Sequence, residues 1–107
     1  MMEPVNNEGQ KSILDSLDGY GIISNKIPEE GMKIGFMYRE EPDDHQDTGW
    51  RFLLGTETRQ YTENDKNHRQ LPISEIMAMD PAIVPYLTRP FGTDLERIPG
   101  KDSFQVL

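Results

Sequence analysis

Three side chains with metal-ligand chemistry alternate in the acidic segment near the middle of the chain. Asp43, His45 and Asp47 occupy positions one, three and five of a calcium-binding loop register. Such a loop needs glycine at its sixth position for a sharp turn and glutamate at its twelfth as a bidentate ligand. The sequence has Thr48 and Leu54 at those positions. The register fails, and we predict neither a metal site nor a cofactor.

The residue types that could do catalysis are also poorly arranged. The two histidines, His45 and His68, lie in polar segments, and there is no histidine pair at metal-ligand spacing, no GxSxG motif and no phosphate-cradling glycine loop. Paired carboxylates such as Asp43 with Asp44 could act as acid and base only in a cleft that shifts their pKa values. Their neighbours are hydrophilic, which argues against such a cleft. We therefore predict that the protein is not an enzyme.

The composition describes a small acidic protein. Its 107 residues have the size of one domain. The formal net charge is -8, from 19 acidic and 11 basic residues, and no local basic stripe offsets it. Such a surface repels phosphate backbones, so we predict no direct binding to nucleic acid and favour a basic protein partner. The simpler alternative is that the charge only keeps the protein soluble.

The chain contains no cysteine, which excludes a disulfide framework, a thiolate metal site and a cysteine nucleophile. This composition fits a reducing compartment, and we expect a cytoplasmic protein. The first residues, MMEPVNNEGQ, lack the positive start and apolar run of a signal peptide. The longest wholly apolar stretch, residues 76–79, is far too short to cross a bilayer. We therefore predict no membrane association.

The acidic segment is flanked by two alternating segments that predict a β-hairpin over residues 32–54. Because successive side chains of a strand point to opposite faces, one set of apolar residues can share a core surface. That set is Met32, Ile34, Phe36 and Tyr38 in the first arm and Trp50, Phe52 and Leu54 in the second. The same alternation places Lys33, Arg39 and Arg51 together on the opposite face. They would form either a small cationic patch or cross-strand partners for nearby carboxylates.

The rest of the chain carries shorter signals. We expect a flexible segment over residues 1–12 and a single domain over residues 13–107. Within it, the patterns predict a short helix over 13–17, a strand over 21–24, an edge strand near Tyr61, a helix over 71–79, a helical turn starting at Asp80 and Pro81, and strands over 93–97 and 103–106. Together they predict an α+β fold, with a mainly antiparallel twisted sheet of about 4–6 strands and short helices packed on one face.

A series of short motifs carries a family resemblance. They are Ile23-Ser24-Asn25-Lys26-Ile27, Gly35-Phe36-Met37-Tyr38-Arg39-Glu40-Glu41-Pro42, Thr48-Gly49-Trp50-Arg51-Phe52, Asp80-Pro81, Gly92-Thr93 and Glu96-Arg97. In this order they resemble a bacterial family catalogued as domain of unknown function 2185, which is grouped with the immunity protein 33 class of polymorphic toxin systems. The resemblance spans about residues 21–97. It implies an α+β domain whose members are proposed, in part by genomic inference, to neutralise a toxin by binding it, and it brings no catalytic residues.

Two functions follow as hypotheses. The first is a non-enzymatic binding protein, an immunity protein, whose acidic face meets a basic partner such as a toxin. The second is a small-ligand sensor or accessory domain, in which Ser24, Asn25, Lys26 and Arg39 line a polar pocket for an anionic metabolite. The candidate contact residues for a partner or ligand are Ser24, Asn25, Lys26, Arg39, Glu40, Asp43, Asp44, Asp47 and Arg51. The sequence predicts no particular oligomeric state.

Overall fold

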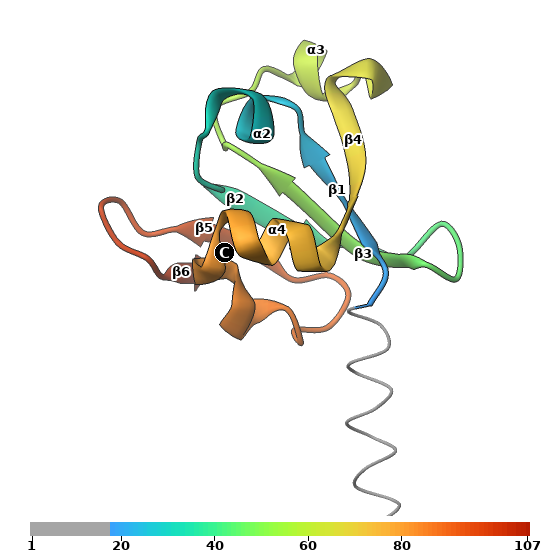
Figure 1. Cartoon of the computed structure of the whole chain (residues 1–107). Coiled ribbons are helices and arrows are strands. Elements are labelled where there is room, and N and C mark those ends of the chain that lie inside the picture. The colour runs from blue at the N-terminus through green and yellow to red at the C-terminus, as the bar shows by residue number, and fades with distance from the viewer. Residues whose placement is uncertain (1–17) are drawn as a thin grey trace, which may run out of the picture.

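A computed structural model describes residues 18–107, which form one six-stranded sheet with short helices (Figure 1). The strands are β1 (Tyr20–Ser24), β2 (Phe36–Arg39), β3 (Asp47–Leu53), β4 (His68–Pro72), β5 (Asp94–Arg97) and β6 (Phe104–Val106). The helices are α2 (Lys26–Glu30), α3 (Arg59–Thr62) and α4 (Ile73–Met79), with 3-10 helices η1 (Asp65–Asn67) and η2 (Pro81–Tyr86). The segment 1–12 and the helix expected over 13–17 lie outside the described residues.

The strands follow the order β4-β1-β3-β2-β5-β6 across the sheet. Only β1 and β3 are parallel, and every other neighbouring pair is antiparallel. The α+β fold with a mainly antiparallel sheet of about 4–6 strands is therefore confirmed. The central strand β3 contacts both β1 and β2, so the hairpin that the sequence predicts also anchors the N-terminal strand.

The helices α4 and η2 cover one face of the sheet, as predicted (Figure 1). Asp80 separates them, because its side chain accepts a hydrogen bond from the amide of Ala82 and Pro81 takes the first helical position. The core between the helices and the sheet consists of fully buried apolar side chains. They are Ile73, Ile76, Ile83 and Leu87 from the helices and their flank, Ile23, Met37, Trp50, Phe52 and Leu95 from the strands, and Ile27 and Ile34 from α2 and the segment that follows it.

The predicted hairpin forms, but the predicted facing of its first arm is wrong. Met37 is fully buried opposite Phe52, whereas Phe36 and Tyr38 are half-buried on the other face of the sheet. The alternation breaks because β2 begins only at Phe36, and the amide of the buried Ile34 binds the Asp80 carboxylate instead of a neighbouring strand. The alternating residues 32–38 therefore belong to two segments: a non-strand segment before Phe36, and β2, which begins there.

A second difference concerns the edge of the sheet. The predicted edge strand near Tyr61 is wrong, because Tyr61 lies in the short helix α3. The sheet ends in β4 on one side and β6 on the other, and β4 is a polar strand that pairs with β1, with Gln70 opposite Ile22. No helix among residues 18–107 is long and apolar enough to cross a membrane.

Candidate partner-binding site

The loop between β2 and β3 exposes most of its acidic side chains. The side chain of Asp43 is 77% exposed and that of Glu40 is 51% exposed. Asp44 is exposed as well, yet it organises the loop, because its carboxylate accepts hydrogen bonds from the amides of Gln46 and Asp47 at 2.9 and 3.1 Å. The loop is therefore an ordered acidic surface and not only a flexible connection.

Asp47 and Arg51 form the buried base of this loop. The Arg51 guanidinium binds both oxygens of Asp47, with Nη1 to Oδ1 at 2.8 Å and Nη2 to Oδ2 at 2.7 Å. Burial alone would raise the pKa of Asp47, but hydrogen bonds from Arg51 and from the amides of Asp43 and Gly49 outweigh it and hold this pKa at about 2. Both side chains are buried, so these two predicted contact residues support the loop from beneath.

The charge of the loop is not neutralised by this pair. Arg51 also binds Glu40 through Nε at 2.6 Å and lies 3.9 Å from Asp43. Residues 40–47 hold five carboxylates, so one guanidinium leaves a net charge of -4. Hydrogen bonds to Asp47 and Glu40 raise the pKa of Arg51 although burial opposes it, so the pair stays ionised. The result is a strongly negative loop held together by hydrogen bonds and a buried ion pair.

Arg39 lies on the opposite side of the sheet, facing the helices. Its Nε donates to the carbonyl of Thr48 at 2.8 Å and its Nη1 to the carbonyl of Arg89 at 2.9 Å. Its guanidinium also stacks over the rings of Trp50 and Phe91. Burial lowers the pKa of Arg39. At 9% exposure this side chain holds the loop after η2 in place and is not available as a surface cation.

The predicted grouping of Lys33, Arg39 and Arg51 on one face is therefore wrong. Lys33 is exposed, and its Nζ lies 3.6 Å from Oδ1 of Asp102. The side chains of Arg39 and Arg51 lie on opposite faces of the hairpin. Arg51 pairs with the carboxylates of Glu40 and Asp47, which agrees with the alternative prediction that these cations are partners for nearby carboxylates. The cationic patch does not form.

Ser24, Asn25 and Lys26 lie at the end of β1, away from Arg39. Ser24 is fully buried, and the amide group of Asn25 donates to the carbonyl of Lys66 and accepts from Arg69. The Lys26 ammonium lies 4.6 Å from the centre of the Tyr61 ring. These residues tie β1 to the segment before β4, so the structure does not assemble the predicted pocket for an anionic metabolite.

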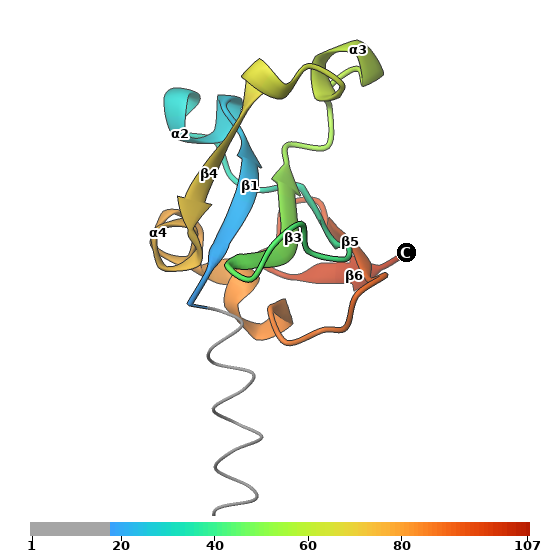
Figure 2. The same ribbon diagram turned by 90° about the vertical axis from the view of Figure 1, so that its right-hand side faces the viewer.

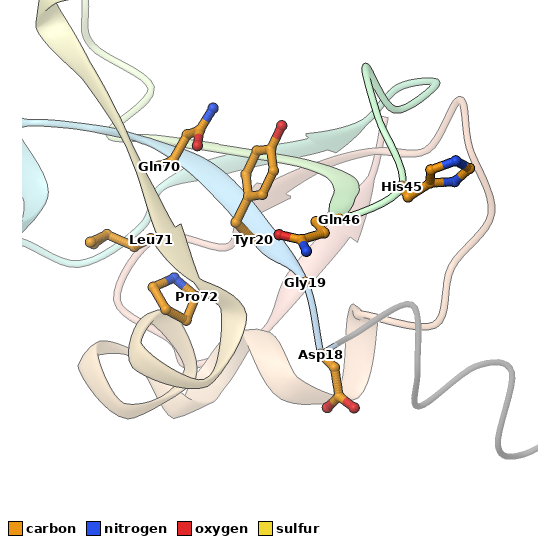
Figure 3. A pocket seen from close by; sticks show the side chains of 8 residues that line it. All are labelled: Asp18, Gly19, Tyr20, His45, Gln46, Gln70, Leu71 and Pro72. Carbon is orange, nitrogen blue, oxygen red and sulfur yellow. The ribbon is translucent and has the colours of Figure 1, made fainter.

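A different hollow of about 550 Å³ lies beside the acidic loop (Figure 3). Its walls come from residues 18–20, 45–46 and 70–72, and Figure 3 shows Tyr20 and Gln70 pointing to the same side of the sheet. The Tyr20 hydroxyl donates to Asp44 at 3.0 Å, and burial together with this bond raises the pKa of Tyr20 to about 12. Sequence reasoning missed this hollow because its three walls are far apart in the chain.

The described residues contain no group of three or more histidine, cysteine or acidic side chains that could hold a metal ion. His45 is exposed in the loop, and His68 lies in β4 with Nε2 at 2.9 Å from the carbonyl of Thr62. Four of the five loop carboxylates, those of Glu40, Asp43, Asp44 and Asp47, are engaged by amides, by Tyr20 or by Arg51. The exposed carboxylates of the loop give this part of the surface a negative potential that attracts cations.

The comparison with protein families finds one family whose matched range includes all the motifs that carry the resemblance. A family model described as "Immunity protein Imm33 domain" matches residues 21–107, which include all but the first residue of the sheet. No curated protein and no solved structure matches the chain. The resemblance to the immunity protein 33 class is thus confirmed over most of the sequence, and the chain belongs to the Imm33 immunity protein domain family.

Proposed function

We propose that this protein is a non-enzymatic bacterial immunity protein that neutralises a cognate toxin by binding it. The observation that carries the proposal is the ordered acidic loop, whose exposed Glu40, Asp43 and Asp44 stand above a buried ion pair. Family membership supplies the toxin as the class of partner. A cytoplasmic location remains a prediction from the absence of cysteine.

A preformed acidic surface suits the capture of a basic toxin. Its excess negative charge attracts a basic surface over about 10 Å at moderate salt and accelerates encounter. Because the Arg51–Asp47 pair already fixes the base of the loop, little conformational entropy is lost on binding. The exposed carboxylates of the loop could thereby occupy basic positions that the toxin uses for an anionic substrate.

Co-expression tests this function directly. A candidate toxin domain encoded next to this chain's gene is expressed from an inducible promoter in a bacterial host, with or without the full chain. We expect growth to be restored by the chain and not by an empty vector. Survival that stays unchanged at equal protein levels would reject the immunity role for that toxin.

The second hypothesis is that the protein is a small-ligand sensor. The hollow of Figure 3 is a candidate ligand site for it, at a different place from the pocket that the sequence predicted. Its volume falls within the range of ligand pockets, roughly 300–1,000 Å³. Asp18 lines the hollow and Asp44 binds Tyr20 beside it, so an anionic metabolite would be repelled and a neutral or cationic ligand favoured. A thermal-shift screen tests this alternative. It requires a compound that raises the melting temperature of the wild type but not that of Gln70→Ala.

A further inference from the structure

The face of the sheet that points away from α4 carries an apolar centre. Figure 2 shows α4 on one side of the sheet. Strand register places Ile22, Tyr38 and Arg51 side by side across three strands, and pairs Phe36 with Leu53 in the next row. Ile22, Phe36, Tyr38 and Leu53 are all half-buried. We call these four residues the apolar centre of the open sheet face.

The apolar centre is shaped by its own side chains. The rings of Phe36 and Tyr38 lie 5.8 Å apart with a tilt of 39°. A hollow of about 170 Å³ lies beside Tyr38 and Leu53, bordered at one end by Thr62 of α3. Such a hollow accepts one apolar side chain of a partner. Contiguous apolar area with a polar border is typical of protein-interaction sites.

The border of this face is acidic on several sides. Its carboxylates come from three parts of the chain: Glu40 and Asp43 from the hairpin loop, Asp65 from η1, and Asp94 and Glu96 from β5. Asp94 lies opposite Tyr38 and Glu96 opposite Phe36, so the acidic border continues on the side of the sheet far from the loop tip. All five are exposed. We call them the carboxylate rim.

Two arginines border the apolar centre, Arg51 and Arg69, and both are engaged by carboxylates. Arg69 lies beside Asp43 and Asp65, and its Nη2 binds Oε2 of Glu29 at 2.6 Å. Arg51 lies between Ile22 and Tyr38, but its guanidinium is held by Asp47 and Glu40. The rim therefore keeps its negative character around an apolar centre. A partner that fits must offer apolar side chains at its middle and lysine or arginine around them.

We propose that the open sheet face is the surface on which a basic protein partner docks, with an apolar side chain of the partner beside Tyr38 and Leu53 and its basic residues on the carboxylate rim. This inference rests on the proposed immunity function, and it places the contact on the sheet as well as on the loop tip. The rim carboxylates lie at the loop, at η1 and along β5. They therefore set where the partner's basic residues must lie relative to its apolar side chain.

Two charge-reversal variants separate the position of the charge from its amount. Asp94→Lys with Glu96→Lys changes the rim, and Glu30→Lys with Glu75→Lys changes exposed positions on α2 and α4. Each pair changes the formal net charge by four, from -8 to -4. Binding is measured by calorimetry against an inactivated form of a toxin domain from which the chain protects cells in the co-expression test.

We expect the rim variant to lose affinity by more than about tenfold, while the control pair changes affinity by less than about threefold. An equal loss in both variants would show that only net charge matters and would overturn the inference. Unchanged affinity in the rim variant, with wild-type chain binding, would overturn it as well and leave the immunity function standing.

A second measurement does not need the toxin. The full chain labelled with ¹⁵N is titrated with a synthetic peptide of alternating lysine and leucine, and amide shifts are mapped by NMR. We expect the shifts to centre on Ile22, Tyr38 and Asp94 and to vanish in the rim variant but not in the control pair. Shifts confined to the loop tip, or spread evenly over the acidic surface, would contradict the proposed docking face even if co-expression shows protection.

Discussion

Arg51 and Asp47 form a two-point ion pair between residues four positions apart on one strand, with nitrogen–oxygen distances of 2.7 and 2.8 Å. In a regular strand, residues at this spacing are about 13 Å apart. The strand is shortened at Gly49, where φ is +86° and the amide donates to Asp47 at 2.8 Å. The same irregularity shifts the register between β1 and β3. The ion pair and the kink therefore form one unit beneath the acidic loop.

The first prediction removes one partner of this pair. Arg51→Met leaves the buried Asp47 carboxylate without its cation, and such a loss costs about 3–5 kcal/mol of unfolding free energy. Urea denaturation followed by the fluorescence of Trp50, which is the only tryptophan and is fully buried, measures the change. The matched control is Arg59→Met, because the Arg59–Glu63 pair is exposed and contributes less than about 1 kcal/mol. Equal denaturation midpoints for the two variants would contradict the structural role of Arg51.

The second prediction concerns acid stability. The pKa of Asp47 in the folded protein is about 2, below its ordinary value of 3.8, so the folded state binds this proton less readily than the unfolded state. The contribution of Asp47 is complete above pH about 4 and is lost as the pH falls toward about 2. Asp47→Asn has no proton to gain. The stability difference between the wild type and this variant should therefore narrow over that window, and a constant difference would argue against the depressed pKa.

The third prediction compares two glycines with left-handed backbone. At Gly49 a Cβ would lie 2.1 Å from the carbonyl oxygen of Glu40, whereas at Gly92, with φ of +91°, no atom lies within 4 Å. Gly92→Ala should lower the free energy of unfolding by about 1–2 kcal/mol, which is the cost of placing a residue with a Cβ in left-handed backbone. In Gly49→Ala the new Cβ must also push the Glu40 backbone away. The melting temperature in thermal unfolding should therefore fall clearly more for Gly49→Ala than for Gly92→Ala. Similar losses would show that the loop is free to adjust.

Local signals in the sequence were sufficient for several elements of the fold. Asp80 followed by Pro81 predicts a helix start from capping chemistry alone, and the structure shows that cap. The alternation of Trp50 and Phe52 likewise identifies their shared core face. The parallel pairing of β1 with β3 could not be predicted, because nothing local specifies a contact between strands so far apart in the chain.

The candidate site shows where residue type misleads. Arg39 suggests a surface cation, yet carbonyls of Thr48 and Arg89 satisfy its guanidinium inside the protein. Asp47 suggests part of the acidic tip, and the kink at Gly49 buries it. The family motifs were more informative than either charge, because they reflect the order of several segments along the chain and not the exposure of single residues.

The fourth prediction addresses the association rate. Glu41→Lys with Asp43→Lys reverses two exposed charges of the loop, while Asp44 is left unchanged because it binds Tyr20 and two loop amides. We expect association with the toxin domain to slow at least severalfold at about 0.01 M salt and to approach the wild-type rate at about 1 M, where the Debye length is only ~3 Å. Stopped-flow kinetics measures both rates. A rate deficit that is independent of salt would argue against electrostatic steering.

The last prediction tests the apolar centre of the open sheet face. Tyr38→Ala removes an aromatic side chain that is half-buried in the free protein and stands opposite Asp94. If a partner packs against it, the variant should lose about 1–3 kcal/mol of binding free energy, mainly through faster dissociation. The control is Val84→Ala, because Val84 is 42% exposed on η2, which covers the other face of the sheet. Calorimetry gives the affinities, and urea denaturation shows whether both variants remain folded. Comparable affinities for folded Tyr38→Ala and Val84→Ala would place the contact elsewhere, whereas a selective loss would place it beside Tyr38.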